Sequence, residues 1–395
     1  MTTLTMMGAG SIDLMKDRLS DHSLMPLPHP IRVDAAFGSP FDTGLFESLG
    51  IMKAVRPYLT DAATPTEWII NHVPGMQELA MVHLGLPGAT HLGVFMLMMI
   101  RARLRAHGDP ILEVTPPLQA LLAETDLQNG LPVRFFRSPH PLVYLAFARP
   151  NPLRVPNRLS GLHECEGAYI GMYPLPPHHP LLTHTRRTRA LRLDPAKPTR
   201  AIELLITGSP VSKANVLDDA SQDLMLLIQD EDEDLSAVLE RHIAFFTTPE
   251  ASYRGAGKVD PNEVAMIRPV IYELAKVLLY LNLAEVERLP RLERTDLERH
   301  LRQFGKLTAR RRERLARVYD RTLIGPPAAV EIPVEAEAAR ADGARTVRPH
   351  WRRGHFRRIH YGEGLSDRRI GWIRPTLVKA AEAFGLHRPK PEDHG

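Results

Sequence analysis

The middle of this sequence consists of short runs of β-branched and aromatic residues, and this pattern limits the possible folds more than any other feature. The runs are bounded by Pro, Gly, Asn and Asp and cover residues 111–115, 132–137, 142–149, 168–175, 201–207 and 224–229. Runs of this length and composition, flanked by such turn-forming residues, predict β-strands. Few helical crossovers separate them, and only parallel strands need such crossovers. We therefore expect a central, mainly antiparallel sheet within residues 110–230.

Helical patterns come before this sheet. Residues 64–67 read Thr-Pro-Thr-Glu, the order of an N-cap, a first-turn proline and a capping-box glutamate, so we predict a helix from there to residue 73. A second helix is predicted over 91–106. It is apolar at first, and its C-terminal end carries cations that suit the helix dipole and are expected to face solvent: Arg101, Arg103 and Arg105.

The helical period returns after an acidic turn at residues 230–234. Apolar spacing predicts helices over 235–246 and 261–283, and two more charged ones are predicted over 295–304 and 308–320. The Ala- and Glu-rich stretch that follows is typical of a linker. The sequence thus predicts an α+β protein with a mainly helical N-terminal part (1–109), a β-rich centre (110–230), a helical region (231–326), a linker (327–346) and a basic C-terminal region (347–395).

Composition excludes several classes of protein. Hydrophobic residues make up 44% of the 395 residues and charged residues 24%, which is ordinary for a globular chain and excludes a disordered or collagen-like one. Charged side chains interrupt the first thirty residues, so no signal sequence is expected. The most apolar run, 92–100, is about half as long as a membrane span. We expect a cytoplasmic protein without a membrane partner.

A single cysteine removes disulfide frameworks and multi-cysteine metal sites. It lies in His163-Glu164-Cys165-Glu166, where two carboxylates disfavour the thiolate. The second histidine of a zinc-protease motif would stand at position 167, which is glycine. We therefore expect a structural role for this segment, and we predict no metal and no cofactor.

Positive charge is concentrated in the last third of the chain. The net charge is +4, but residues 286–320 carry +5 and residues 341–395 carry +6, which leaves −7 for the remainder. Blocks of one sign indicate a partner of the opposite sign. An anionic partner is therefore expected for the C-terminal third.

The most informative stretch lies within residues 345–374, which hold nine arginines, three histidines, two acidic residues and no lysine. The use of arginine without lysine indicates planar, bidentate contact with phosphate or carboxylate groups. Period-two alternation over 350–361, a Gly-Glu-Gly turn at 362–364 and a return strand at 370–373 predict a β-hairpin. We expect this basic β-hairpin to pack on the 261–283 helix, with a short helix over 378–384 after it.

A hairpin rich in arginine and aromatic residues offers charge for a phosphate backbone and rings for unpaired bases, as proteins that hold single-stranded nucleic acid do. We therefore predict an RNA-binding surface. The residues expected to form it are His350, Trp351, Arg352, Arg353, His355, Phe356, Arg357, Arg358, Tyr361, Arg368, Arg369, Trp372 and Arg374.

The histidines of this stretch leave alternatives open. A metal-independent ribonuclease would use two imidazoles as general acid and base, with the candidates His350, His355, His360 and Tyr361. As metal ligands the three histidines would not converge, because a spacing of five residues alternates between the faces of a strand. A further alternative is a peptide-binding module whose sheet captures a peptide strand, with the hairpin merely structural.

Several motifs resemble a known family. Residues 349–357, 361–364 and 370–375 are similar to the C-terminal signature of plasmid and phage proteins whose characterised members are type V-A anti-CRISPR proteins. The helix segment at 278–282 and residues 318–320 are also similar, and the resemblance covers about residues 260–378. It implies a mobile-element regulator that recognises the type V-A nuclease during translation and lowers the amount of its message. The implied partners are RNA or a ribosome-associated nascent chain, including the N-terminal peptide of the nuclease; no catalytic residue is implied.

Overall fold

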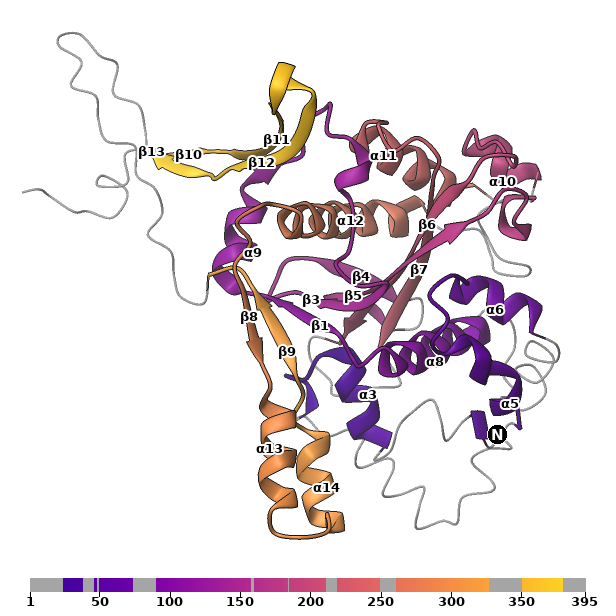
Figure 1. Cartoon of the computed structure of the whole chain (residues 1–395), viewed down its shortest axis with the longest axis vertical. Coiled ribbons are helices and arrows are strands. Elements are labelled where there is room, and N and C mark those ends of the chain that lie inside the picture. The colour runs from indigo at the N-terminus through magenta and orange to yellow at the C-terminus, as the bar shows by residue number, and fades with distance from the viewer. Residues whose placement is uncertain are drawn as a thin grey trace, which may run out of the picture.

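A mixed β-sheet runs through the middle of the fold and carries helices on both faces (Figure 1). The structure is a computed structural model, and it describes residues 24–37, 46–47, 50–73, 90–157, 160–183, 185–210, 219–248, 261–326 and 350–378. The predicted α+β class is confirmed. The predicted linker at 327–346 lies outside the described residues.

The elements follow one another as the sequence patterns broadly predict. The helices are α3 (His29–Phe37), α5 (Met52–Val55), α6 (Thr66–His72), α8 (Thr90–Ala106), α9 (Pro116–Ala123), α10 (Thr185–Ala190), α11 (Leu235–Phe246), α12 (Pro261–Leu281), α13 (Glu293–Arg302) and α14 (Ala309–Ala316). The strands are β1 (Ile111–Val114), β2 (Thr125–Asp126), β3 (Leu142–Ala146), β4 (Arg154–Asn157), β5 (Gly161–Leu175), β6 (Thr199–Ser209), β7 (Ala220–Ile228), β8 (Arg288–Arg291), β9 (Arg321–Ile324), β10 (His350–Arg352), β11 (Gly354–Tyr361), β12 (Asp367–Ile373) and β13 (Thr376–Val378). Within the described part of the chain, no helix combines the length and the apolar character that a membrane crossing requires.

The main sheet has the strand order β7-β6-β5-β3-β1-β9-β8, with β4 attached to β5. Antiparallel pairing joins β7, β6, β5 and β3, and β8 is antiparallel to β9. Strand β1 is parallel to both β3 and β9. The connection from β1 to β3 contains helix α9, which supplies the crossover that a parallel pair needs. The sheet is therefore mainly antiparallel, as predicted, with a parallel centre at β1.

Both faces of the sheet are buried, each against its own group of helices. Along β3, Val143 and Leu145 pack with α11 and α12, whereas Tyr144 packs with α6 and α8 on the other side (Figure 1). Alternate side chains of a strand point to opposite faces, so a strand buried on both faces is a continuous apolar run. This explains why residues 142–146 are all buried.

Residues 132–137, predicted as a strand, form a 3-10 turn instead. The turn covers Val133–Phe135. Its backbone N–H groups bind the acidic turn that precedes α11: Val133 N–H donates to the Glu233 carbonyl at 2.9 Å, and Arg134 N–H donates to the Glu231 carbonyl at 2.9 Å. These tertiary contacts use the donors that a strand would have needed, so the local β-propensity is overridden.

The start of α6 is capped from another element rather than by its own sequence. Thr64, the predicted N-cap, instead donates its hydroxyl to Asp61. The carboxylate of Glu203, on β6, accepts the N–H groups of Thr66 at 3.1 Å and Glu67 at 2.8 Å. A buried carboxylate at a helix N-terminus satisfies donors that the helix leaves unpaired and interacts favourably with the helix dipole. The predicted capping box is therefore wrong, although the helix is confirmed.

The arginines near the end of α8 are also corrected, because two of them are buried rather than solvated. Arg101 is 1% exposed and donates to Asp34 at 2.6 Å and, through Nε, to the Pro30 carbonyl at 3.1 Å. Arg103 is 1% exposed and donates to the Thr66 hydroxyl at 2.8 Å. Each guanidinium thus holds N-terminal segments against α8. Buried charges persist only with partners of this kind.

Candidate nucleic-acid interface

The basic C-terminal stretch forms one long β-hairpin. Strands β11 and β12 pair in register from His355↔Ile373 to Tyr361↔Asp367. Strands β10 and β13 continue the same register, with Trp351 opposite Leu377, and the ladder is interrupted only around residues 353–354. The predicted hairpin is therefore confirmed. Val378, predicted as the first residue of a short helix, instead ends β13, and residues 379–384 lie outside the described residues.

The hairpin is attached to the body through aromatic packing and a two-residue strand. Phe356 is fully buried, and Trp372 stacks on it with ring centroids 5.9 Å apart. The Trp372 ring also meets Tyr280 of α12 edge-on at 5.5 Å, and its N–H donates to the Thr125 hydroxyl at 3.2 Å. Strand β11 pairs in parallel with β2 through Gly354. The predicted packing on the 261–283 helix is confirmed (Figure 1).

We predict that replacing Phe356 with alanine releases this hairpin. Truncating a buried phenylalanine costs about 3–5 kcal/mol, because the apolar contacts are lost and a cavity remains. Hydrogen exchange of the amides in 354–373 should accelerate while β6 keeps its protection. Ile373→Ala is the matched control, since Ile373 is 38% exposed and should change exchange little. Equal acceleration in β6 would show that the hairpin is not a separate unit.

Two arginines of the predicted RNA surface have structural partners. Arg353 Nε lies 3.1 Å from the Asp126 carboxylate, and its Nη2 donates to the Ala123 carbonyl at 3.1 Å. Arg368 donates to carbonyls of the turn, including that of Ser366 at 2.9 Å. These contacts hold the hairpin on β2 and close its turn.

Other arginines present free guanidinium groups. Arg357 and Arg358 are exposed, and neither has a carboxylate partner among the described residues. Arg369 lies over the ring of Tyr361 at 5.6 Å, and Arg374 lies over Trp372 at 5.7 Å. An aromatic face orients an arginine without neutralising its charge. The hairpin therefore presents oriented, uncompensated cations together with one exposed ring, that of Tyr361, whereas Trp372 is half-buried against the core. This combination is suitable for binding phosphates and an unpaired base.

The histidines do not come together. His355 is half-buried and His360 is exposed, and their odd spacing places them on opposite faces of β11. Tyr361 shares a face with His355, but six residues of strand separate the two by about 20 Å. His350 lies in β10, and its side chain is outside the described part of the structure. The described candidates for a ribonuclease site therefore do not form an acid–base pair.

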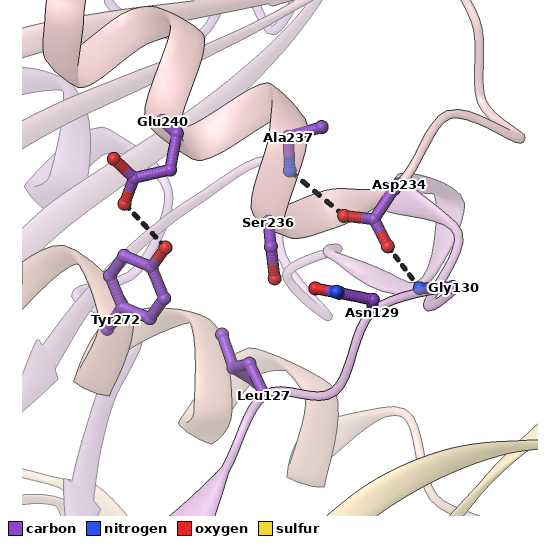
Figure 2. Close-up of a pocket in the computed structure, with 8 residues that line it drawn as sticks. All are labelled: Leu127, Asn129, Gly130, Asp234, Ser236, Ala237, Glu240 and Tyr272. Carbon is purple, nitrogen blue, oxygen red and sulfur yellow. Dashed lines mark hydrogen bonds between the residues drawn. The ribbon is translucent and has the colours of Figure 1, made fainter.

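Beside the hairpin lies a surface groove that sequence reasoning missed. One part is lined by residues of the 127–130 loop, α11 and α12, as Figure 2 shows: Leu127, Asn129, Gly130, Asp234, Ser236, Ala237, Glu240 and Tyr272. A second part shares Leu127 and Tyr272 and extends to Thr125 and Glu273. The residues come from segments more than a hundred positions apart, so no local pattern could have predicted the groove.

The groove is acidic, and its carboxylates differ in whether their oxygens have hydrogen-bond partners. Asp234 caps α11 by accepting the Ala237 N–H at 3.0 Å, and Tyr272 donates its hydroxyl to Glu240 at 2.6 Å (Figure 2). Glu273 is only 7% exposed; one carboxylate oxygen pairs with Lys276 at 3.0 Å, and the other has no partner among the described residues. Burial raises the pKa of this carboxyl. An unsatisfied buried acceptor favours a ligand that donates hydrogen bonds.

The segment around the single cysteine is part of the core. Cys165 is fully buried in β5, and burial raises the pKa of its thiol far above the ordinary value. His163 is buried as well and contacts the Ser160 hydroxyl at 2.9 Å. Among the residues that the structure describes, no three His, Cys, Asp or Glu side chains are grouped closely enough to hold a metal ion. The segment has the structural surroundings expected from its sequence.

Comparison with known proteins identifies the family. A model of the AcrVA2-like family, described as the anti-CRISPR type V subtype A2 family, matches residues 112–380. This chain belongs to the AcrVA2-like family. The match begins in β1 and extends past β13, so it contains the sheet, the α13–α14 pair and the whole hairpin.

Membership in the AcrVA2-like family confirms the resemblance found in the sequence and gives the chain an anti-CRISPR-like function directed at CRISPR machinery. Among solved structures, the chain is similar to one described as the crystal structure of AcrVA2, with 12% identity and a TM-score of 0.44 over 85% of this chain and 97% of that chain. The comparison with curated proteins gave no match.

Proposed function

We propose that this AcrVA2-like protein lowers production of a type V-A CRISPR nuclease by binding RNA of the translating message through the β11–β12 hairpin. Family membership supports a CRISPR-directed role. The observation that carries the RNA-binding step is the uncompensated charge of Arg357, on the same face of the hairpin as the Arg369–Tyr361 pair, and of Arg358 on the opposite face. Phosphates would bind the guanidinium groups, and the exposed ring of Tyr361 would stack on an unpaired base.

The proposed interaction predicts a steep dependence on salt. Each phosphate neutralised on a single strand contributes roughly −0.7 to the slope of log affinity against log salt, so four arginines give a slope of about −3. The double variant Arg357→Glu/Arg358→Glu should reduce the affinity for a labelled single-stranded RNA by at least about tenfold at low salt. Fluorescence anisotropy over a salt series measures both quantities.

A matched control separates local contact from overall charge. Arg299→Glu/Arg302→Glu makes the same change in net charge on α13, where both arginines already pair with acids, and should change RNA affinity little. In cells, the amount of nuclease mRNA should return toward its normal level when the hairpin variant replaces the wild-type protein. RNA affinity that is unchanged by the hairpin variant would contradict the proposal. It would favour instead a peptide-binding function of the acidic groove, which Glu273→Gln would then test.

A further inference from the structure

The two helices α13 and α14 form a pair that projects from the body, at the end of the molecule opposite the β11–β12 hairpin (Figure 1). Strands β8 and β9 connect the pair to the sheet. Asp320, just before β9, accepts the backbone N–H groups of Arg294 at 2.9 Å and Thr295 at 3.1 Å. The projection is thus fixed at its base by backbone pairing and by a capping carboxylate.

The two helices differ in whether their arginines have acidic partners. On α13, Arg299 pairs with Asp296 at 2.9 Å, and Arg302 Nε donates to Glu298 at 2.8 Å. Helix α14 carries four arginines and one glutamate in eight residues. Three of its arginines are exposed and have no partner among the described residues: Arg310, Arg312 and Arg314. Arg299 and Arg302 of α13 thus have acidic partners, whereas Arg310, Arg312 and Arg314 of α14 have none among the described residues.

One side of α14 packs against the rest of the projection, and this packing fixes the orientation of the helix. Leu315 is buried at 5% exposure, and Arg311 donates to the Phe304 carbonyl at 3.2 Å, so this side faces α13 and the loop. Arg310 and Arg314 are one turn apart, about 6 Å along the axis. Like charges at this spacing destabilise an isolated helix by a few tenths of a kcal/mol. A bound polyanion would offset that repulsion by attracting both cations.

An exposed aromatic ring lies at the same tip. Phe304, in the loop between the helices, is 63% exposed, and its ring meets that of His300 edge-on at 5.1 Å. Arginines beside an exposed ring are the combination that binds single-stranded RNA, because guanidinium groups contact phosphates and the ring stacks on an unpaired base.

We propose that the tip of the α13–α14 pair is a second RNA-binding surface, in which Arg310 and Arg314 contact phosphates and Phe304 stacks on an unpaired base. This surface is separate from the β11–β12 hairpin and does not rest on the function proposed for it. A protein with both surfaces would hold RNA at two distant points.

The test uses the full chain and a fluorescein-labelled single-stranded RNA, measured by anisotropy over a salt series. Arg310→Glu/Arg314→Glu should weaken binding about tenfold and reduce the steepness of the salt slope by about 1.4, the value for two phosphate contacts. Phe304→Ala should weaken binding several-fold without changing the slope, since it removes no charge. Ultraviolet crosslinking should place RNA on the peptide containing residues 303–317. Thermal unfolding followed by circular dichroism verifies that each variant is folded.

The matched control is Arg299→Glu/Arg302→Glu, which makes the same charge change on the paired helix of the same projection. Equal weakening by this control would overturn the proposal, because it would show long-range electrostatics rather than contact. Unchanged affinity of the α14 variant would also overturn it, and capture of an acidic protein by the wild type but not by that variant would then assign the tip to a protein partner. If the α14 variant weakens binding while Arg357→Glu/Arg358→Glu does not, the tip is the RNA site and the function proposed for the hairpin fails.

Discussion

Replacing Arg32 with methionine is expected to lower the free energy of unfolding by about 3–5 kcal/mol, the usual cost of removing one partner from a buried ion pair. Arg32 on α3 is completely buried. Its guanidinium donates to Glu166 at 2.6 Å and to Asp219 at 2.6 Å. Without it, two carboxylates would share a site from which water is excluded, and among the described residues Arg149, 2.8 Å from Glu166, would be the one arginine left to balance them.

The pKa directions of the two acids agree with this description. Although burial opposes ionisation of Glu166, the charge and hydrogen bonds of Arg32 lower its pKa below the ordinary value. Burial and the nearby Glu166 charge raise the pKa of Asp219 to about 7, despite its contact with Arg32. Glu166 is therefore the ionised partner of Arg32, and Asp219 is the acid that would take up a proton first in the variant.

Urea unfolding followed by circular dichroism measures the effect. Arg105→Met is the control, because Arg105 pairs with Asp34 near the surface, where it is 26% exposed and the pair is about 2.7 Å long. Exposed pairs contribute roughly 0–1 kcal/mol, so this variant should remain close to wild type. A loss below about 1 kcal/mol for Arg32→Met would show that the buried charges are compensated elsewhere.

Acidification is expected to destabilise the protein by about 3 kcal/mol between pH 6.5 and pH 4 through His242 alone. This imidazole is buried between α11 and β7; its Nε2 accepts the Leu227 N–H at 2.9 Å, and its other nitrogen contacts the Val238 carbonyl at 2.8 Å. Burial lowers the pKa of His242 from 6.5 to about 4. Both contacts suit a neutral ring, and a protonated ring would lose the bond from Leu227.

The direction of this pH dependence follows from the number of protons that the folded and unfolded states bind. Between pH 6.5 and pH 4 the unfolded chain binds a proton at this histidine and the folded chain does not, so stability falls as the pH falls, by about 1.4 kcal/mol per unit. Urea unfolding of wild type and His242→Gln at several pH values in this range measures the difference. The variant should show a shallower dependence, and parallel curves for the two proteins would contradict the prediction. His29, whose pKa burial lowers to about 3, leaves part of the dependence in both proteins.

Sequence patterns predicted those parts of the fold that neighbouring residues determine. The all-buried run of β3 and the apolar spacing of α11 and α12 follow from local periodicity. The hairpin was also predictable, since its alternation and its Gly-Glu-Gly turn lie within one short stretch. Strands β8 and β9 were missed because β8 reads Arg-Leu-Pro-Arg and is exposed throughout, so it has no apolar alternation to detect.

The candidate site was only partly predictable, for a related reason. The arginines of the hairpin were identified, but the sequence could not show that Arg353 would pair with Asp126, more than two hundred positions away. Likewise, Glu203 caps the start of helix α6 by accepting the N–H of Glu67, which lies 136 positions earlier in the sequence. Such partners are chosen by the tertiary fold, and a polar residue in a sequence gives no sign of which distant group it will meet.

The way in which the hairpin joins the body has a consequence for how this family can diversify. Its link to β2 combines main-chain pairing, in which Gly354 N–H donates to the Glu124 carbonyl at 2.9 Å, with the inward contacts of the Arg353 and Trp372 side chains. Position 354 itself is restricted to glycine, because a Cβ there would lie 2.8 Å from the Ile373 carbonyl oxygen. The outward side chains of β11 and β12 take no part in this link. Substitutions at those positions are therefore compatible with the fold, so the outer face of the hairpin can change while the attachment itself stays constant.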